Sequence, residues 1–271
     1  MRAPIVDGIF YPAQKDMLET KVKELLDGAG LGSDIAAGAS AIVVPHAGYN
    51  YTGELAAKGF KAVLDRDIHT AVLLAPVTRD AQDGLFLCDF KAFQTPMGEV
   101  FIDQEKVKAL LNHKGRFSVN NYPFLEEHSI EVQLPFIQYL WPQAKIVPLH
   151  MGRQNPGTVK QLAKALQEVF GKDIDNTLFV VSANASPYLQ RELAQEYAAS
   201  YLSLCTAGDW EAMLAELQKR HPLPNGTGCT AAVLGMAGSM PRVTVLGTGD
   251  SKGEKIVCYA SLAVSFQQYC R

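Results

Sequence analysis

The chain has 271 residues, of which 48% are hydrophobic and 20% charged, with a formal net charge of -3 at pH 7. This ordinary globular composition provides no basic surface for nucleic acid, and no run of about 18 apolar residues indicates a transmembrane helix. The first residues also lack an apolar stretch long enough for a signal peptide, so a cytoplasmic location is expected, with neither nucleic acid nor a membrane as a partner.

Apolar residues recur in patterns typical of alternating helices and strands. Helices are predicted over 16–26, 53–64, 104–111, 129–140, 158–170, 189–213 (in two or more pieces) and 229–236. Strands are predicted over 41–44, 70–74, 144–150, 177–182, 243–246 and 256–264, with residues 81–93 extended. This alternation predicts an α/β fold whose mostly parallel central sheet is covered by helices on both faces. Because we find no linker, low-complexity tract or internal repeat, residues 1–271 are interpreted as a single domain.

A histidine follows directly after the predicted strand 41–44. Pro45 ends the strand, His46 comes next, and Gly48 leads into the following helix. The carboxyl ends of strands in α/β proteins are where ligands gather, so His46 is the first candidate for chemistry. It could instead cap the next helix or bond a neighbouring loop, and Tyr49 could either wall a pocket or pack in the core.

A second polar group surrounds His128. Glu126 and Glu127 precede it directly, and Glu131 follows it three residues later. Carboxylates and an imidazole at this spacing could ligate a metal or exchange protons. Alternatively, Ser129 could cap the predicted helix, with the acidic residues favouring its positive N-terminal end. Both interpretations remain open at this point.

Other candidates for the same cleft carry less weight. His150 ends the predicted strand 144–150 and could line the cleft, although a loop position is favoured. Arg79 and Arg153 could reach the cleft, where an arginine would favour an anionic ligand. The glycine-rich residues 247–251 follow no phosphate-binding pattern and are predicted to form a turn.

Together these motifs resemble those of the Memo-like proteins, which share the fold of the catalytic subunit of class III extradiol ring-cleavage dioxygenases (LigB-like). The resemblance runs nearly end to end and implies a single Memo-like domain. It rests on five matching stretches in the family's order: 3–13, 45–49, 95–100, 127–136 and 247–260. Microbial relatives occur alongside a radical enzyme and an AMMECR-type protein, so the resemblance implies a possible protein partner.

The chain departs from this family pattern at the metal site. Members that keep a metal have a second histidine after the next strand, where this chain has Thr78, or Arg79 with a shift of one. A later family segment contains an acid and a histidine, and the corresponding residues here are Asn184 and Pro187. Threonine and asparagine are poor ligands for iron or copper, and proline offers no side-chain donor at all.

The family's cysteine corresponds to Cys229, or to Thr227 if Gly228 is the matching glycine. A non-haem iron dioxygenase needs about three protein ligands, typically two histidines and a carboxylate. His46, His128 and Cys229 could still hold a single zinc, copper or iron ion. Otherwise His46 and His128 form a hydrogen-bonded pair in a vestigial cleft without a cofactor.

Two functional hypotheses follow, and whether the protein is an enzyme stays open. In the first, a Memo-like protein without dioxygenase activity acts as a binding or scaffold module through a vestigial cleft around His46 and His128. In the second, a rebuilt site makes it a metal-dependent oxidoreductase or hydrolase-type enzyme that acts on a small molecule. A structural subunit with an irrelevant cleft is the third possibility. The candidate cleft residues are His46, Tyr49, Thr78, Arg79, Glu127, His128, Asn184 and Cys229.

Overall fold

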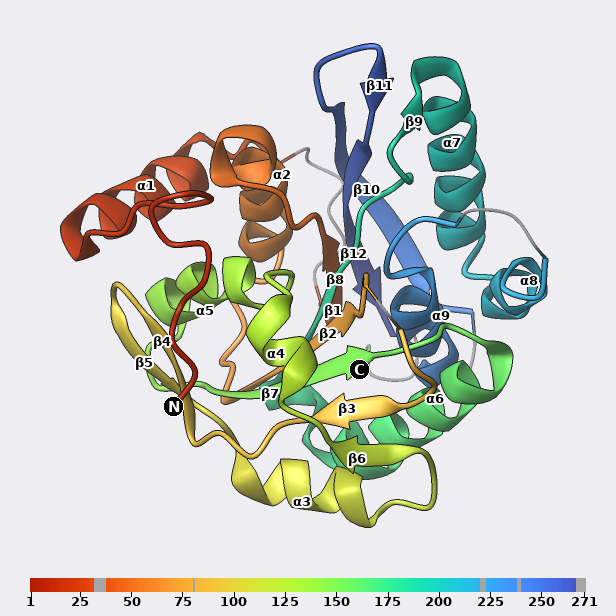
Figure 1. The fold of residues 1–271 in the computed structure, drawn as a ribbon, viewed down its shortest axis with the longest axis horizontal. Coiled ribbons are helices and arrows are strands. Elements are labelled where there is room, and N and C mark those ends of the chain that lie inside the picture. Colours follow the sequence, from red (N-terminus) through yellow and green to blue (C-terminus); the bar gives the residue numbers. More distant parts are fainter. Residues whose placement is uncertain (32–37, 80, 220–222, 238–239, 267–271) are drawn as a thin grey trace.

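The computed structural model describes residues 1–31, 38–79, 81–219, 223–237 and 240–266 (Figure 1). The helices are α1 (Lys15–Gly28), α2 (Tyr49–Lys61), α3 (Gln104–Asn112), α4 (Tyr122–Glu126), α5 (Leu134–Leu140), α6 (Pro156–Phe170), α7 (Arg191–Ala207), α8 (Trp210–Glu216) and α9 (Thr227–Met236), with 3-10 turns η1 (Glu131–Gln133) and η2 (Gly171–Asn176). The strands are β1 (Ala41–Val44), β2 (Thr70–Pro76), β3 (Leu85–Leu87), β4 (Ala92–Thr95), β5 (Gly98–Phe101), β6 (Phe117–Val119), β7 (Lys145–Met151), β8 (Thr177–Ser182), β9 (Leu189–Gln190), β10 (Arg242–Asp250), β11 (Lys255–Ile256) and β12 (Cys258–Ser265).

An eight-stranded mixed sheet in the order β10-β12-β1-β8-β2-β7-β3-β6 forms the centre of the molecule. Its middle strands β1, β8, β2 and β7 run parallel to one another, whereas β12 is antiparallel to both β1 and β10. Helices flank this sheet (Figure 1), with α2 packed against β1, β10 and β12 and α9 packed against β2 and β8. Strands β1, β2 and β8 are buried along their whole length, which explains their unbroken apolar sequences. The predicted α/β class and central sheet are confirmed.

The parallel arrangement determines where the candidate residues meet. His46 follows β1, Thr78 follows β2, Ser182 ends β8 and His150 lies in the last part of β7. Since parallel strands place their carboxyl ends at one edge of the sheet, these four positions share that edge.

The predicted turn at residues 247–251 is wrong, because strand β10 continues through the glycines to Asp250 and pairs with β12. A register shift between Val245 and Gly247 accommodates the irregularity. At Gly247 a Cβ atom would lie 3.0 Å from the Leu55 side chain on α2, so glycine permits close packing here instead of ending the strand.

Several predicted boundaries also differ from the structure. The helix predicted to begin at residue 53 begins at Tyr49, and the one predicted over 129–140 is split into η1 and α5. Pro135 lies in the first turn of α5, where its missing N–H costs no helical hydrogen bond. Helix α4 has no counterpart among the predicted elements. Among the described helices, none is both long and apolar enough to cross a membrane.

Candidate functional site

His46 is almost completely buried, with 5% of its surface exposed, and its ring is held by Ser182. The His46 Nδ1 atom lies 3.2 Å from the Ser182 hydroxyl, which donates to the Ser129 carbonyl at 2.6 Å and accepts from Gln133 Nε2 at 3.1 Å. Because the single hydroxyl hydrogen is used on Ser129, His46 must donate its Nδ1 hydrogen to Ser182. The lone pair of the His46 ring therefore lies on Nε2.

His128 lies edge-on to His46, with 6.0 Å between the ring centroids and 72° between the ring planes. Its other aromatic neighbour is Phe10, whose ring centroid is 4.6 Å away. No hydrogen bond joins the two imidazole rings in the described part of the chain. The structure thus brings the two predicted histidines together as an edge-to-face pair.

Burial keeps these histidines neutral at physiological pH. It lowers the pKa of His46 to about 3, and the neighbouring His128 and His150 act in the same direction. Burial also lowers the pKa of His128, although Glu127 and Glu131 partly oppose the change. Neutral imidazoles supply hydrogen-bond acceptors and metal ligands but no positive charge for an anionic ligand.

His150 does not lie in a loop, so the position favoured from the sequence is wrong. It is fully buried in β7, because β7 pairs with β2 as far as Met151 and Pro76. Its ring packs against Phe124 at 4.7 Å, and neither ring nitrogen makes a hydrogen bond of good geometry among the described residues, although the backbone of Pro76 and Ala75 lies close enough to influence its pKa. Burial lowers the His150 pKa to about 3, with the backbone of Pro76 partly opposing the effect.

Thr78 and Glu127, 49 residues apart in the sequence, are joined directly. The Thr78 backbone N–H donates to Glu127 Oε1 at 2.5 Å, and the Thr78 hydroxyl lies 2.7 Å from Oε1 and 2.9 Å from Oε2. Thr78 stands where the family resemblance expects a ligand histidine. In this chain Thr78 instead binds the buried carboxylate of Glu127.

The Glu131 side chain makes no helix-capping hydrogen bond and instead binds the N-terminal segment, residues 1–11. Its carboxylate forms a buried ion pair with Arg2 and accepts hydrogen bonds from the backbone N–H of Ile5 (3.0 Å), the backbone N–H of Val6 (3.0 Å) and the Tyr11 hydroxyl (2.6 Å). We call this set of contacts the Glu131 clasp.

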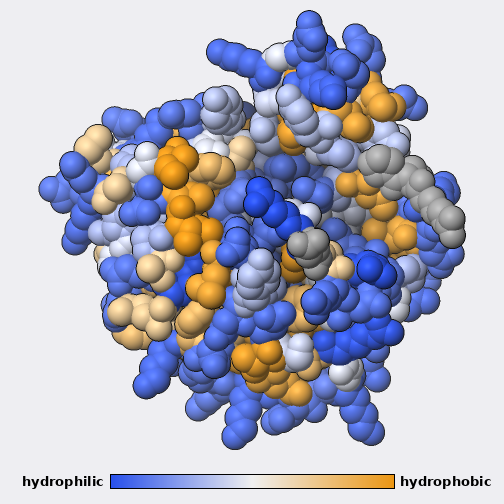
Figure 2. All heavy atoms as spheres, in the orientation of Figure 1, coloured by the Kyte–Doolittle hydropathy of each residue, from blue (hydrophilic) through white to orange (hydrophobic). Residues whose placement is uncertain are grey.

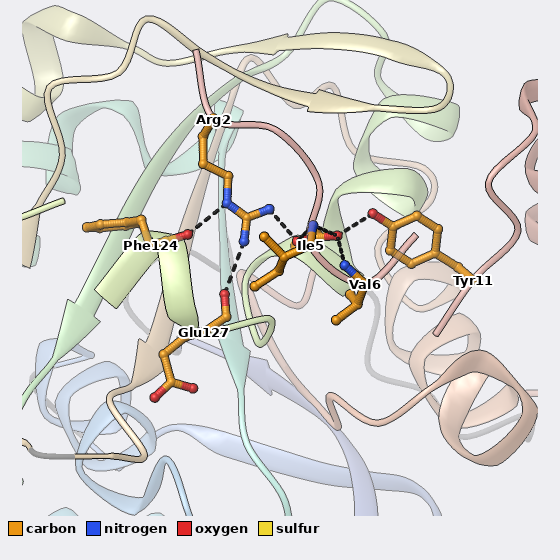
Figure 3. A network of polar contacts seen from close by, with 7 residues as sticks. Arg2, Ile5, Val6, Tyr11, Phe124 and Glu127 are labelled. Atoms are coloured by element: carbon orange, nitrogen blue, oxygen red, sulfur yellow. Dashed lines mark hydrogen bonds and ion pairs between the residues drawn. The ribbon is translucent and has the colours of Figure 1, made fainter. Parts of the chain in front are cut away.

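Arg2 completes its own hydrogen bonds with the carbonyl oxygens of Phe124 (2.7 Å) and Glu127 (3.2 Å), between which it points in Figure 3. The sequence reasoning did not identify Arg2. One signal was available, because Glu131 lies between the apolar residues Ile130 and Val132 and an acid in such a setting needs a buried partner.

The other candidates take separate positions. Tyr49 is buried in the core, where its hydroxyl donates to the Val132 carbonyl at 2.8 Å and its ring packs against Phe136. The Asn184 side-chain oxygen lies 3.5 Å from the His46 backbone nitrogen. Arg79 lies on the surface.

Cys229 is fully buried in α9, and burial raises the pKa of its thiol to about 12. The alternative residue Thr227 donates its hydroxyl hydrogen to the Pro224 carbonyl at 2.7 Å. Within the described ranges, no three or more His, Cys, Asp and Glu side chains are arranged to hold a metal ion. A pocket of about 600 Å³ lies between α7 and residues 223–227, but none of the candidate cleft residues lines it.

Comparisons with known proteins identify the family. The family model described as Memo-like protein matches residues 2–261. A MEMO1 family protein of Methanopyrus kandleri is 30% identical over 93% of this chain and 89% of its own length, and one of Thermotoga neapolitana is 28% identical over 98% and 100%. A third, from Thermococcus onnurineus, is 34% identical over 68% of this chain and 64% of its own length.

The crystal structure of an uncharacterised protein of Escherichia coli K12 is similar in fold, with a TM-score of 0.55 over 82% of this chain and 98% of that one. The sequence identity with that protein is 11%, so the likeness concerns the fold alone. The family match covers nearly the whole chain and agrees with the motifs around His46 and His128. The chain therefore belongs to the Memo-like protein family.

Proposed function

We propose that this protein is a binding module that uses the cleft around His46 and His128 and does not catalyse metal-dependent ring cleavage. The contact between Thr78 and Glu127 carries this proposal. The residue at the expected histidine position and the nearest carboxylate are bonded to each other at 2.5–2.9 Å. Thr78 and Glu127 are therefore bonded to each other, and a metal ion could bind either residue only after these hydrogen bonds were broken.

The remaining side chains do not fit a mononuclear iron centre, which needs about three firm ligands. His46 offers one ring nitrogen, since its Nδ1 is committed to Ser182. Pro187 has no donor atom, and burial favours the protonated thiol of Cys229, whereas a metal binds the thiolate. We derive no reaction step through a metal, and the proposed binding role requires no cofactor.

The partner we propose is a protein, following the association of microbial Memo-like proteins with a radical enzyme and an AMMECR-type protein. The neutral histidines support this choice over a small anionic substrate, because they offer no positive charge to an anion. Arg79, the candidate that would favour an anion, lies on the surface and makes no ion pair among the described residues.

One observation favours a second function, a metal-dependent oxidoreductase or hydrolase-type enzyme with a rebuilt site. The unprotonated Nε2 of His46 and the neutral ring of His128 lie in neighbouring side chains, and both could ligate zinc, copper or iron. A third ligand would have to come from a rearranged side chain.

Metal analysis separates the two functions. Untagged protein purified without chelator is analysed by mass spectrometry beside a His46→Ala variant, with His69→Ala as a surface-histidine control. We expect less than about 0.1 equivalent of iron, copper or zinc in all three proteins, and no tight binding of added metal. Near-stoichiometric metal that is lost only in His46→Ala would contradict the proposal and support the enzyme. As a positive control, Thr78→His adds back an imidazole and should increase the affinity for zinc.

A further inference from the structure

The segment held by the Glu131 clasp continues to the cleft. The Phe10 carbonyl accepts a hydrogen bond from the Tyr49 backbone N–H at 2.8 Å. The chain passes Gly48 so closely that a Cβ atom there would lie 3.4 Å from the Phe10 Cα atom. The Phe10 ring is half-buried and meets the His128 ring edge-on at 4.6 Å. The Phe10 ring therefore forms a wall beside His128, and it belongs to a segment that the clasp holds.

The outer side of this segment is apolar. In Figure 2 a band of hydrophobic spheres lies in the part of the view that the N-terminal segment occupies in Figure 1. Ile5 and Ile9 contribute to the apolar surface of the segment, with 38% and 75% of their surfaces exposed. The Glu131 carboxylate holds the backbone of Ile5 and Val6, whereas Arg2 is also attached to β4 by backbone hydrogen bonds to Ala92 (3.0 Å) and Gln94 (2.8 Å).

We propose that Glu131 is a positioning residue for the cleft and that Phe10, held in place by the Glu131 clasp, controls access to His128. The ion pair with Arg2 fixes the start of the segment, and the bonds to Ile5, Val6 and Tyr11 fix the turn that presents Phe10. Loss of the clasp should release this wall and uncover His128 while the sheet stays intact. The significance of this access rests on the proposed binding role of the cleft, but the test uses neither a metal nor a partner.

The accessibility of His128 can be measured with diethyl pyrocarbonate, which modifies neutral imidazoles. Peptide mass mapping gives the modification rate of His128 relative to His69, whose side chain is 67% exposed and serves as an internal reference. We expect Phe10→Ala to raise the modification rate of His128 relative to His69 by about tenfold, because the rate is proportional to the time that the His128 ring is uncovered. Phe10→Tyr should restore the slow rate, and Ile9→Ala, on the exposed side of the same segment, should leave it unchanged.

The role of Glu131 is tested in the same assay together with hydrogen exchange. Glu131→Gln should remove the protection of the Ile5 and Val6 amides and also raise the His128 ratio, while peptides from β1 and β8 stay protected. If this variant does not fold, Tyr11→Phe removes a single bond of the clasp and should give a smaller increase of the same kind. An unchanged His128 ratio in Phe10→Ala, or released amides with an unchanged ratio in a clasp variant, would overturn the proposal. A result of the metal analysis that contradicts the proposed function would leave this result unchanged, so the two failures are distinguishable.

Discussion

Replacing His150 by leucine should stabilise the protein and remove part of its sensitivity to acid. The imidazole is fully buried with two unpartnered nitrogens, so leucine of similar volume removes an uncompensated polar group. Such a group costs about 1–3 kcal/mol, and we expect the variant to gain a stability within that range at pH 7.5.

The pH dependence follows from the pKa of His150, which burial lowers from 6.5 to about 3. Between these two values the unfolded chain binds a proton that the folded protein does not, so stability is complete above pH 6.5 and falls as the pH is lowered. At pH 5 the loss due to His150 is about 2 kcal/mol, from 1.5 pH units at about 1.4 kcal/mol each. His150→Leu removes this loss, which adds to the gain at neutral pH.

Urea unfolding at pH 5.0 and 7.5 measures both effects in a range where most carboxylates remain ionised. The difference in unfolding free energy between the two pH values should shrink by about 2 kcal/mol in His150→Leu. A His69→Ala control, at an exposed histidine, should keep the difference of the parent protein. If His150→Leu keeps the full pH difference, the assignment of His150 as a buried neutral histidine is refuted.

Two further predictions concern packing and the buried ion pair. Arg2→Met and Glu131→Gln should each lower the free energy of unfolding by about 3–5 kcal/mol, because each leaves its buried partner uncompensated. The double variant should lose clearly less than the sum of the two single losses. Additive losses in urea unfolding would show that the two groups do not interact. Gly59→Ala should cost about 1–3 kcal/mol because its Cβ would lie 2.4 Å from the Val44 side chain. The matched change Gly28→Ala, where a Cβ meets nothing within 4 Å, should instead stabilise by about 0.4–1 kcal/mol, so equal effects of the two changes in thermal unfolding would contradict the packing described here.

The sequence predicted well those features that depend on neighbouring residues. The apolar run before His46 gave the correct bounds of β1, and the periodicity of residues 16–26 lies within α1. The family resemblance brought His46 and His128 to the same cleft, where their rings lie 6.0 Å apart.

Features that depend on distant partners were not predictable in this way. A loop position was favoured for His150 because the local sequence does not show that β7 pairs with β2 as far as Met151. Strand β10 likewise continues through its glycines because β12 pairs with it. The contact between Arg2 and Glu131 spans 129 residues, and no local pattern around Arg2 indicates it. Thr78 was interpreted only as the loss of a ligand, because its bonds with Glu127 join residues that are 49 positions apart in the sequence.

The position of β1 in the sheet has a consequence for biosynthesis. This strand precedes both of its partners in the chain, β8 (Thr177–Ser182) on one side and β12 (Cys258–Ser265) on the other. The edge that pairs with β8 has no partner until Thr177–Ser182 has been translated, and the edge that pairs with β12 has none until Cys258–Ser265 has been translated. Such non-local pairing slows folding, because a long loop must be closed before each edge of β1 is paired. The sheet edge that carries His46 is therefore completed only after strands that lie far later in the chain have been made.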